Sequence, residues 1–98
     1  MRSQIKMVIT DLDGTLLNSH GKISKKNLET LKKLGEIGVI RVFATGRSMY
    51  SCRRAVDINC PHDYIAFSTG AGVFCKNTDK ILYAKHIAQK DVLIAIEI

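Results

Sequence analysis

The chain has 98 residues, of which 46% are apolar and 24% charged, and its net charge is +6. This length allows one domain at most, and the ordinary apolar content argues against a disordered chain. Because the basic residues are spread along the whole sequence, we expect solvated helix faces rather than a nucleic-acid surface. Alternatively, the excess positive charge could attract anionic substrates.

Neither a membrane nor an oxidising compartment is expected. No apolar run approaches the ~20 residues that a membrane helix needs, and the N-terminus lacks the apolar region of a secretory signal. Cys52, Cys60 and Cys75 are odd in number and form no CxxC pair, which is typical of reduced thiols. These features predict a cytoplasmic location and no membrane partner.

Three apolar segments are predicted to form strands, with a helix between each pair. Residues 4–11 are too continuously apolar for a half-exposed sheet edge, so a buried strand is expected there. Residues 12–21 form a loop, and Ser24 is the N-cap of a helix that runs to residue 37 and ends at Gly38. Residues 39–44 and 64–67 are the second and third strands, separated by a helix at residues 48–56.

This order of elements predicts an α/β fold: a Rossmann-like parallel sheet with right-handed crossover helices. Residues 1–72 form this unit. In such sheets, ligands bind beyond the carboxyl ends of the strands. The residues with candidate chemistry follow the three strands directly, so we expect them to meet at one edge.

The pattern changes after Gly72. Residues 73–75 and 81–84 flank a turn-like segment and predict a hairpin, and a helix is expected from residue 89. Residues 73–98 therefore begin a second unit. The sequence ends inside the apolar run 92–98 without a cap, which predicts that the chain is cut short.

The segment that carries the most chemistry is DLDGT, which places Asp11 and Asp13 two residues apart after the first predicted strand. Two unit charges ~4 Å apart repel by roughly 4 kcal/mol at an effective dielectric of about 20, so a cation between them or a proton on one of them is expected. Asp11 is the candidate nucleophile toward phosphorus, and Asp13 the candidate general acid and base, with a raised pKa. The alternative is a simple turn at Asp13 and Gly14 with Asp11 capping the strand; the preceding buried strand favours catalysis.

Two further segments are candidates for binding. Thr45, Gly46 and Arg47 follow the second strand, where a hydroxyl and backbone amides at a helix N-terminus hold phosphoryl oxygens; an ordinary turn capped by Thr45 is the alternative. Arg47 is either a substrate clamp or a surface ion-pair residue. The glycine-rich residues 68–72 could wrap a ligand. The three scattered histidines (His20, His62 and His86) are expected on the surface or as polar core residues.

These motifs resemble those of the haloacid dehalogenase superfamily of aspartate-nucleophile phosphatases, in its Cof-type branch with a large inserted cap. Residues 8–17 (VITDLDGTLL) match the first motif and residues 43–47 (FATGR) the second. Residues 68–71 (STGA) resemble the segment that leads into the cap, where Thr69 replaces the usual Asn. The resemblance covers nearly the whole chain, and it implies that residues 73–98 are the start of the α+β cap.

The resemblance also implies a mechanism and a metal. Asp11 accepts the phosphoryl group, Asp13 is the acid/base, and Mg²⁺ is held by a side-chain oxygen of Asp11 and the backbone carbonyl of Asp13. A lysine of a third motif and an acidic residue of a fourth complete this site in the family, and neither motif occurs in the 98 residues. The implied function is hydrolysis of small phosphomonoesters of the sugar type; phosphomutases share the first motif.

Alternative interpretations follow from the missing motifs. The chain could be inactive alone, either as a non-catalytic truncated product or as an N-terminal piece that needs a partner segment. Three strands without the rest of a sheet leave a bare edge, which predicts self-association. A remote alternative is a phospho-acceptor receiver domain, but that fold needs an aspartate after the third strand, where this sequence has Phe67-Ser68-Thr69-Gly70.

Overall fold

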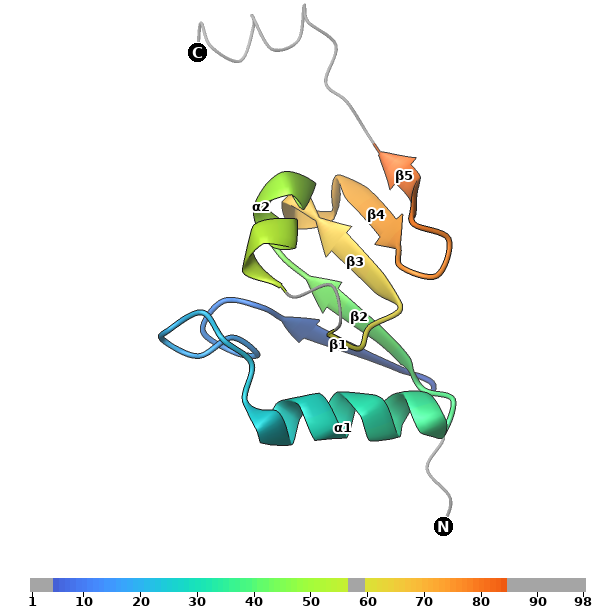
Figure 1. The fold of residues 1–98 in the computed structure, drawn as a ribbon. Helices are drawn as coiled ribbons and strands as arrows, with labels where there is room; N and C mark the ends of the chain where they lie inside the picture. Colours follow the sequence, from blue (N-terminus) through green and yellow to red (C-terminus); the bar gives the residue numbers. More distant parts are fainter. Residues whose placement is uncertain (1–4, 57–59, 85–98) are drawn as a thin grey trace, which may run out of the picture.

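The computed structural model describes residues 5–56 and 60–84, which form one five-stranded sheet with two α-helices (Figure 1). The strands are β1 (Met7–Asp11), β2 (Ile40–Ala44), β3 (Tyr64–Phe67), β4 (Gly72–Cys75) and β5 (Lys80–Ala84), and they lie in that order. Strands β1, β2 and β3 are parallel, and β4 and β5 are added antiparallel. The predicted α/β class is confirmed.

The helices begin and end where local chemistry favours it. Helix α1 (Lys25–Glu36) has Ser24 as its N-cap, with the Ser24 hydroxyl accepting a hydrogen bond from the Asn27 amide. Gly38 follows with a φ of +82°, a conformation that suits glycine and ends the helix. Helix α2 (Met49–Ala55) begins in the same way at Ser48, whose side chain accepts from the Ser51 amide. The capping signal at Ser24 therefore located α1 within about a residue, and the helix expected at residues 48–56 agrees with α2 to the same degree.

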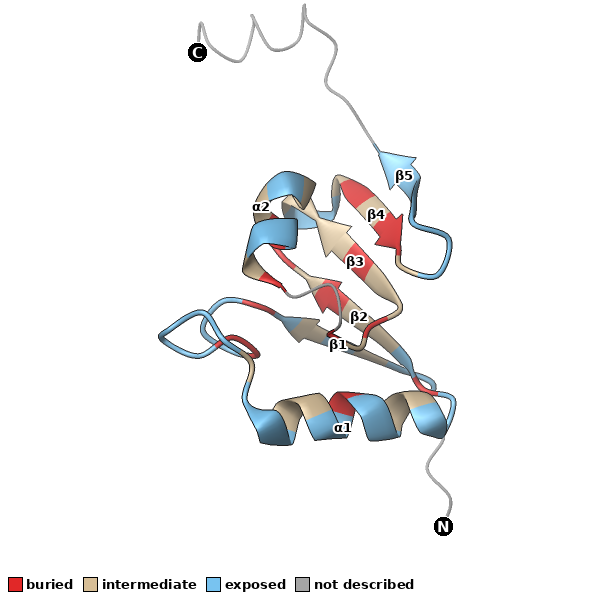
Figure 2. Cartoon of the chain, viewed as in Figure 1, coloured by how far each residue is buried: buried red, intermediate tan, exposed pale blue. Residues whose placement is uncertain are grey.

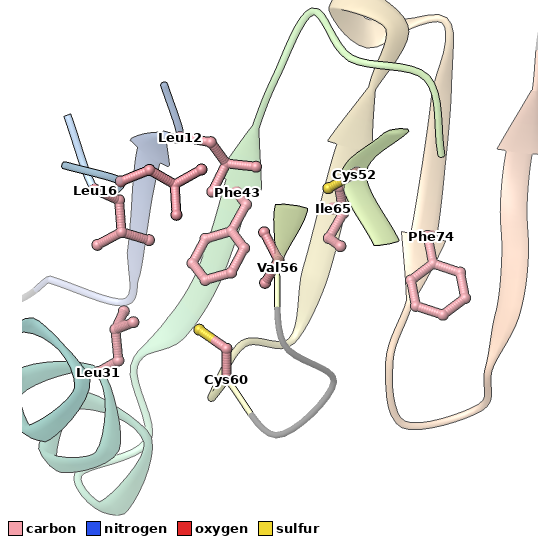
Figure 3. Close-up of a cluster of buried hydrophobic side chains, with 10 residues drawn as sticks. Leu12, Leu16, Leu31, Phe43, Cys52, Val56, Cys60, Ile65 and Phe74 are labelled. Atoms are coloured by element: carbon pink, nitrogen blue, oxygen red, sulfur yellow. The ribbon is translucent and has the colours of Figure 1, made fainter. Parts of the chain in front are cut away.

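The hydrophobic core lies on one face of the sheet, beneath both helices (Figure 3). Phe43, Ile65 and Phe74 are register partners on β2, β3 and β4, so their side chains share that face. Leu31 of α1 and Cys52 of α2 pack in the same cluster. Cys52, Cys60 and Cys75 are all buried.

Strand β1 is not buried as the sequence predicted, because it lies at the edge of the sheet and one of its faces is uncovered. β1 alternates between exposed and half-buried residues (Figure 2), and Ile9 is 62% exposed. Met7 and Ile40 are also exposed, on the sheet face opposite the core. Neither described helix contributes a core residue to that face. The prediction of a buried strand was wrong, because the apolar run reflects side chains that nothing among the described residues covers.

The hairpin of β4 and β5 is hydrogen-bonded to β3 and so extends the same sheet. The division into a unit at 1–72 and a second unit at 73–98 stays a prediction. The helix expected from residue 89 lies outside the described residues. In the part of the chain that the structure describes, no helix is long and apolar enough to cross a membrane.

Candidate functional site

The three predicted segments meet at the carboxyl ends of β1, β2 and β3. There a cavity of about 440 Å³ is lined by Asp11, Thr45, Gly46, Ala66, Thr69 and Gly70, among others. Because parallel strands end at the same edge, residues more than fifty positions apart become neighbours. Asp13 and Arg47 do not line this cavity; they pair with each other beside it.

Asp11 ends β1 at the mouth of the cavity. Its side-chain Oδ1 accepts a hydrogen bond of 2.8 Å from the Leu12 amide, which fixes the orientation of the carboxylate. Leu12 itself is fully buried in the core, whereas Asp11 and Asp13 on either side of it are exposed. The buried leucine therefore anchors a short segment that presents both carboxylates away from the core.

Asp13 forms a two-pronged ion pair with Arg47. Arg47 Nε donates to Asp13 Oδ2 at 2.9 Å, and a terminal guanidinium nitrogen donates to Oδ1 at 2.7 Å. These hydrogen bonds hold the pKa of Asp13 below its ordinary value, with slight burial opposing and the charge of Arg47 assisting. The raised pKa expected for a general acid is therefore wrong for this state of the protein, in which Asp13 is ionised.

Ser51 is a contact of this pair that sequence reasoning missed. The third nitrogen of the Arg47 guanidinium donates to Ser51 Oγ at 3.0 Å. Ser51 lies four residues after Arg47, on α2, which is the spacing at which side chains near a helix meet. This four-residue spacing was the sequence signal from which the contact between Arg47 and Ser51 could have been predicted.

Thr45 joins the second and third segments. Its hydroxyl oxygen accepts from the Arg47 amide at 3.0 Å, and its carbonyl oxygen accepts from the Thr69 amide at 3.0 Å. The side chain is buried, and a hydroxyl that accepts one bond still has its own hydrogen to donate. Residues 45–47 directly precede Ser48, which caps α2, so they lie just before the first turn of this helix, and their expected contacts with phosphoryl oxygens stay a prediction.

The loop at Ser68–Gly70 has a left-handed backbone at three consecutive residues. The φ angles are 49°, 55° and 89° for Ser68, Thr69 and Gly70. Such angles suit glycine and asparagine, and they are unusual for a β-branched residue such as threonine. Thr69 lies beside Gly46, and Thr69 and Gly70 line the same cavity as Asp11. Backbone strain of this kind collects at binding sites.

The donor set at this edge is of the kind that Mg²⁺ prefers, namely carboxylate and carbonyl oxygens. Within residues 5–56 and 60–84, no group of three or more His, Cys, Asp or Glu side chains is placed to hold a metal ion. Asp11 supplies a carboxylate at the cavity, whereas both carboxylate oxygens of Asp13 are taken by Arg47. The residues present therefore fit part of a magnesium site, and the Asp13 side chain is bound to Arg47 instead.

The fold and this edge define an α/β protein with an acidic site at the carboxyl ends of its parallel strands. A family model of haloacid dehalogenase-like hydrolases matches residues 8–98. The chain belongs to this family, whose members include named phosphatases.

Individual relatives agree with the family model. The chain is 30% identical over 87 residues to the 5-amino-6-(5-phospho-D-ribitylamino)uracil phosphatase YcsE of Bacillus subtilis, covering 85% of this chain and 35% of that protein. It is 35% identical over 98 residues to an uncharacterized hydrolase of Schizosaccharomyces pombe, covering 95% and 31%. Among solved structures, the phosphatase BT1666 of Bacteroides thetaiotaomicron matches with a TM-score of 0.82 and 30% identity, covering 95% of this chain and 34% of that one. The chain thus spans about a third of the length of these relatives.

Proposed function

We propose that this chain supplies the phosphoryl-accepting part of a Mg²⁺-dependent phosphomonoester hydrolase. The observation that carries the proposal is the shared cavity, which Asp11 lines together with Thr45, Gly46 and Thr69. A nucleophile at the end of one strand and hydrogen-bond donors at the end of the next are the groups that phosphoryl transfer needs. We also propose a cytoplasmic location, which the odd number of cysteines without a CxxC pair supports.

The proposed reaction has two steps. An oxygen of the Asp11 carboxylate attacks phosphorus, the ester P–O bond breaks, and the leaving alkoxide takes a proton from Asp13. Asp13 then removes a proton from water, which attacks the phosphorus of the aspartyl phosphate and releases inorganic phosphate and the Asp11 carboxylate. For the first step Asp13 must be protonated, so the Arg47 pair has to loosen when the substrate binds.

The binding groups have assigned tasks in this proposal. The Thr45 hydroxyl and the Gly46 amide donate to phosphoryl oxygens, and Arg47 adds positive charge beside them. Asp11 and the backbone carbonyl of Asp13 would hold Mg²⁺, which would supply charge neutralisation. YcsE is named for a substrate with its phosphate on a ribityl chain, which supports small sugar-type phosphates as the substrate class.

A chimera tests the assignment, because the chain spans only a third of its relatives. Residues 8–84 of this chain replace the matching segment of YcsE, and p-nitrophenyl phosphate hydrolysis is measured with Mg²⁺. We expect turnover in the chimera and its loss in Asp11→Asn, while Asp79→Asn, an equal change at an exposed carboxylate away from the cavity, retains it. Equal activity of Asp11→Asn and the parent chimera refutes the nucleophile assignment.

We propose that the isolated chain is inactive. Of the two explanations, a non-catalytic product and an N-terminal piece that needs a partner segment, the uncovered sheet face favours the second. Ile9 and Met7 are exposed on β1, which is the edge of the described sheet. Such edges pair with other chains, so we also propose self-association of the isolated chain. Sedimentation should show oligomers that Ile9→Lys reduces. A monomer that hydrolyses p-nitrophenyl phosphate at the rate of the chimera contradicts this proposal.

A further inference from the structure

A second cavity, of about 410 Å³, lies beside the acidic site, between α2 and the loop that follows β1. The α2 side and the loop contribute the lining residues Arg47, Tyr50, Ser51, Arg54, Leu17 and Gly21, among others. This cavity shares no lining residue with the cavity at Asp11, but Gly46 lines that cavity and Arg47, the next residue, lines this one. The two cavities therefore adjoin at the segment between β2 and α2.

Two guanidinium groups line this cavity, and no carboxylate does. The Arg47 guanidinium donates to Ser51 Oγ at 3.0 Å. The Arg54 guanidinium folds back over the Tyr50 ring, 5.7 Å from its centre, and donates to the Tyr50 hydroxyl at 3.4 Å. Because Tyr50 and Ser51 are consecutive residues near the start of α2, both positive groups lie toward the end of the helix that is nearer the acidic site.

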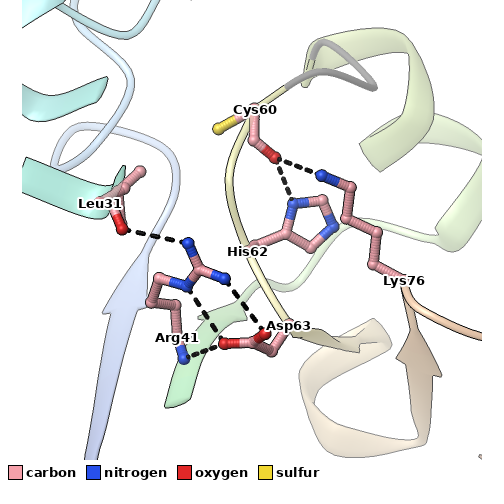
Figure 4. Close-up of polar contacts among 6 residues, drawn as sticks. All are labelled: Leu31, Arg41, Cys60, His62, Asp63 and Lys76. Carbon is pink, nitrogen blue, oxygen red and sulfur yellow. Dashed lines mark hydrogen bonds and ion pairs between the residues drawn. The ribbon is translucent and has the colours of Figure 1, made fainter. Parts of the chain in front are cut away.

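Arg54 differs from the other arginines that the structure describes. Those three each pair with a carboxylate: Arg41 with Asp63 (Figure 4), Arg47 with Asp13, and Arg53 with Asp79. Within residues 5–56 and 60–84, Arg54 has no carboxylate partner. Its planar fork of N–H groups matches the two oxygens of a carboxylate or phosphate, so an anion in this cavity would find an arginine that is not already neutralised.

The proposed reaction places the leaving group of the substrate next to this cavity. In that reaction the leaving oxygen takes its proton from Asp13, whose carboxylate oxygens lie 2.9 and 2.7 Å from nitrogens of Arg47. When the phosphorus is at Asp11, the ester oxygen is therefore close to the residue that lines both the Asp13 contact and the second cavity. The rest of the leaving group then has the Tyr50 hydroxyl and the Arg54 guanidinium within the same cavity.

We propose that this cavity is a specificity site for a second anionic group on the leaving group of the phosphomonoester, either a carboxylate or a second phosphate. The Arg54 guanidinium and the Tyr50 hydroxyl donate to that group. The inference rests on the proposed function, and it narrows the sugar-type substrates to phosphorylated sugar acids or sugar bisphosphates.

Three open-chain ligands test the proposal by calorimetry on the 98-residue chain with Mg²⁺ present. Sorbitol 6-phosphate has one anionic group, 6-phosphogluconate has a carboxylate in place of the terminal alcohol, and sorbitol 1,6-bisphosphate has a second phosphate there. We expect the tighter of the last two to bind about fivefold more tightly than sorbitol 6-phosphate, the upper end for an exposed charge pair, and its identity tells carboxylate from phosphate. Equal binding of all three, or no binding at millimolar concentration, overturns the proposal.

Matched variants assign the preference to one side chain. Arg54→Gln should remove the preference for the second anionic group. Arg53→Gln, an equal loss of charge at the preceding position of α2, should keep it, because Arg53 does not line this cavity. Arg54→Lys retains the charge and should retain part of the preference. If both glutamine variants lose the preference equally, the effect comes from the net charge of the chain and the proposal is refuted.

The result can be separated from that of the proposed function. If the three ligands bind equally while Asp11→Asn abolishes turnover in the chimera, the phosphatase proposal stands and the specificity site is refuted. If the preference depends on Arg54 while Asp11→Asn leaves the chimera fully active, the cavity binds the second anionic group and the nucleophile assignment fails.

Discussion

Replacing Thr69 by asparagine should stabilise the protein. Thr69 has φ 55° and ψ 39°, the left-handed helical conformation, and it is exposed at the cavity wall. Left-handed backbone costs an L-residue roughly 1–2 kcal/mol, with β-branched side chains the least tolerant and asparagine among the most tolerant. Removing most of that strain should add about 1 kcal/mol, which for a domain of this size raises Tm by about 4–8 °C.

Thermal unfolding followed by circular dichroism measures this effect. Thr69→Val keeps the branched side chain and removes the hydroxyl, so it should give no gain. Thr30→Asn makes the same chemical change on the exposed side of α1, where the two residues have similar helix propensities, and Tm should hardly move. If Thr69→Asn leaves Tm unchanged or lowers it, the left-handed loop is not the conformation that this residue adopts.

Three further changes test other parts of the structure. Hydrogen bonds from Arg41 hold the pKa of Asp63 below its ordinary value, so their stabilisation is present above about pH 4 and is lost as the pH falls through the lowered folded-state pKa. Asp63→Asn should therefore cost about 2 kcal/mol in urea unfolding at pH 7 and progressively less below pH 4; a pH-independent cost contradicts this reasoning. Leu12→Ala should cost about 2–5 kcal/mol because Leu12 is fully buried, and a cost below 1 kcal/mol in the same assay would place it outside the core. Arg47→Met should raise the pKa of Asp13 toward its ordinary value in a metal-free carboxyl ¹³C NMR titration, and an unmoved titration would show that the ion pair is absent in solution.

Local signals in the sequence were enough to predict most of the fold. Ser24 marked the start of the first helix because a short hydroxyl side chain satisfies free amides of a first turn. The second helix was expected from residue 48, and the structure shows that Ser48 caps it in the same way. The residues after three parallel strands were expected at one edge, and Asp11 and Thr45 do line one cavity. Strand order and register were not predictable from these signals. Ile9 is apolar in a strand that proved to be exposed, and apolar character alone does not say which face another element covers.

By itself, the sequence determined the elements, the family motifs and the edge where the chemistry would collect, because each depends on residues close together in the chain. Only the tertiary structure decided that Arg47 holds Asp13, since 34 positions separate these residues and their pairing depends on how β1 and β2 lie together. It also decided that His62 is buried and that, among the described residues, one of its nitrogens has no hydrogen-bond partner. Packing against Phe43 and the Cys60 carbonyl, rather than any local pattern, removes this ring from water.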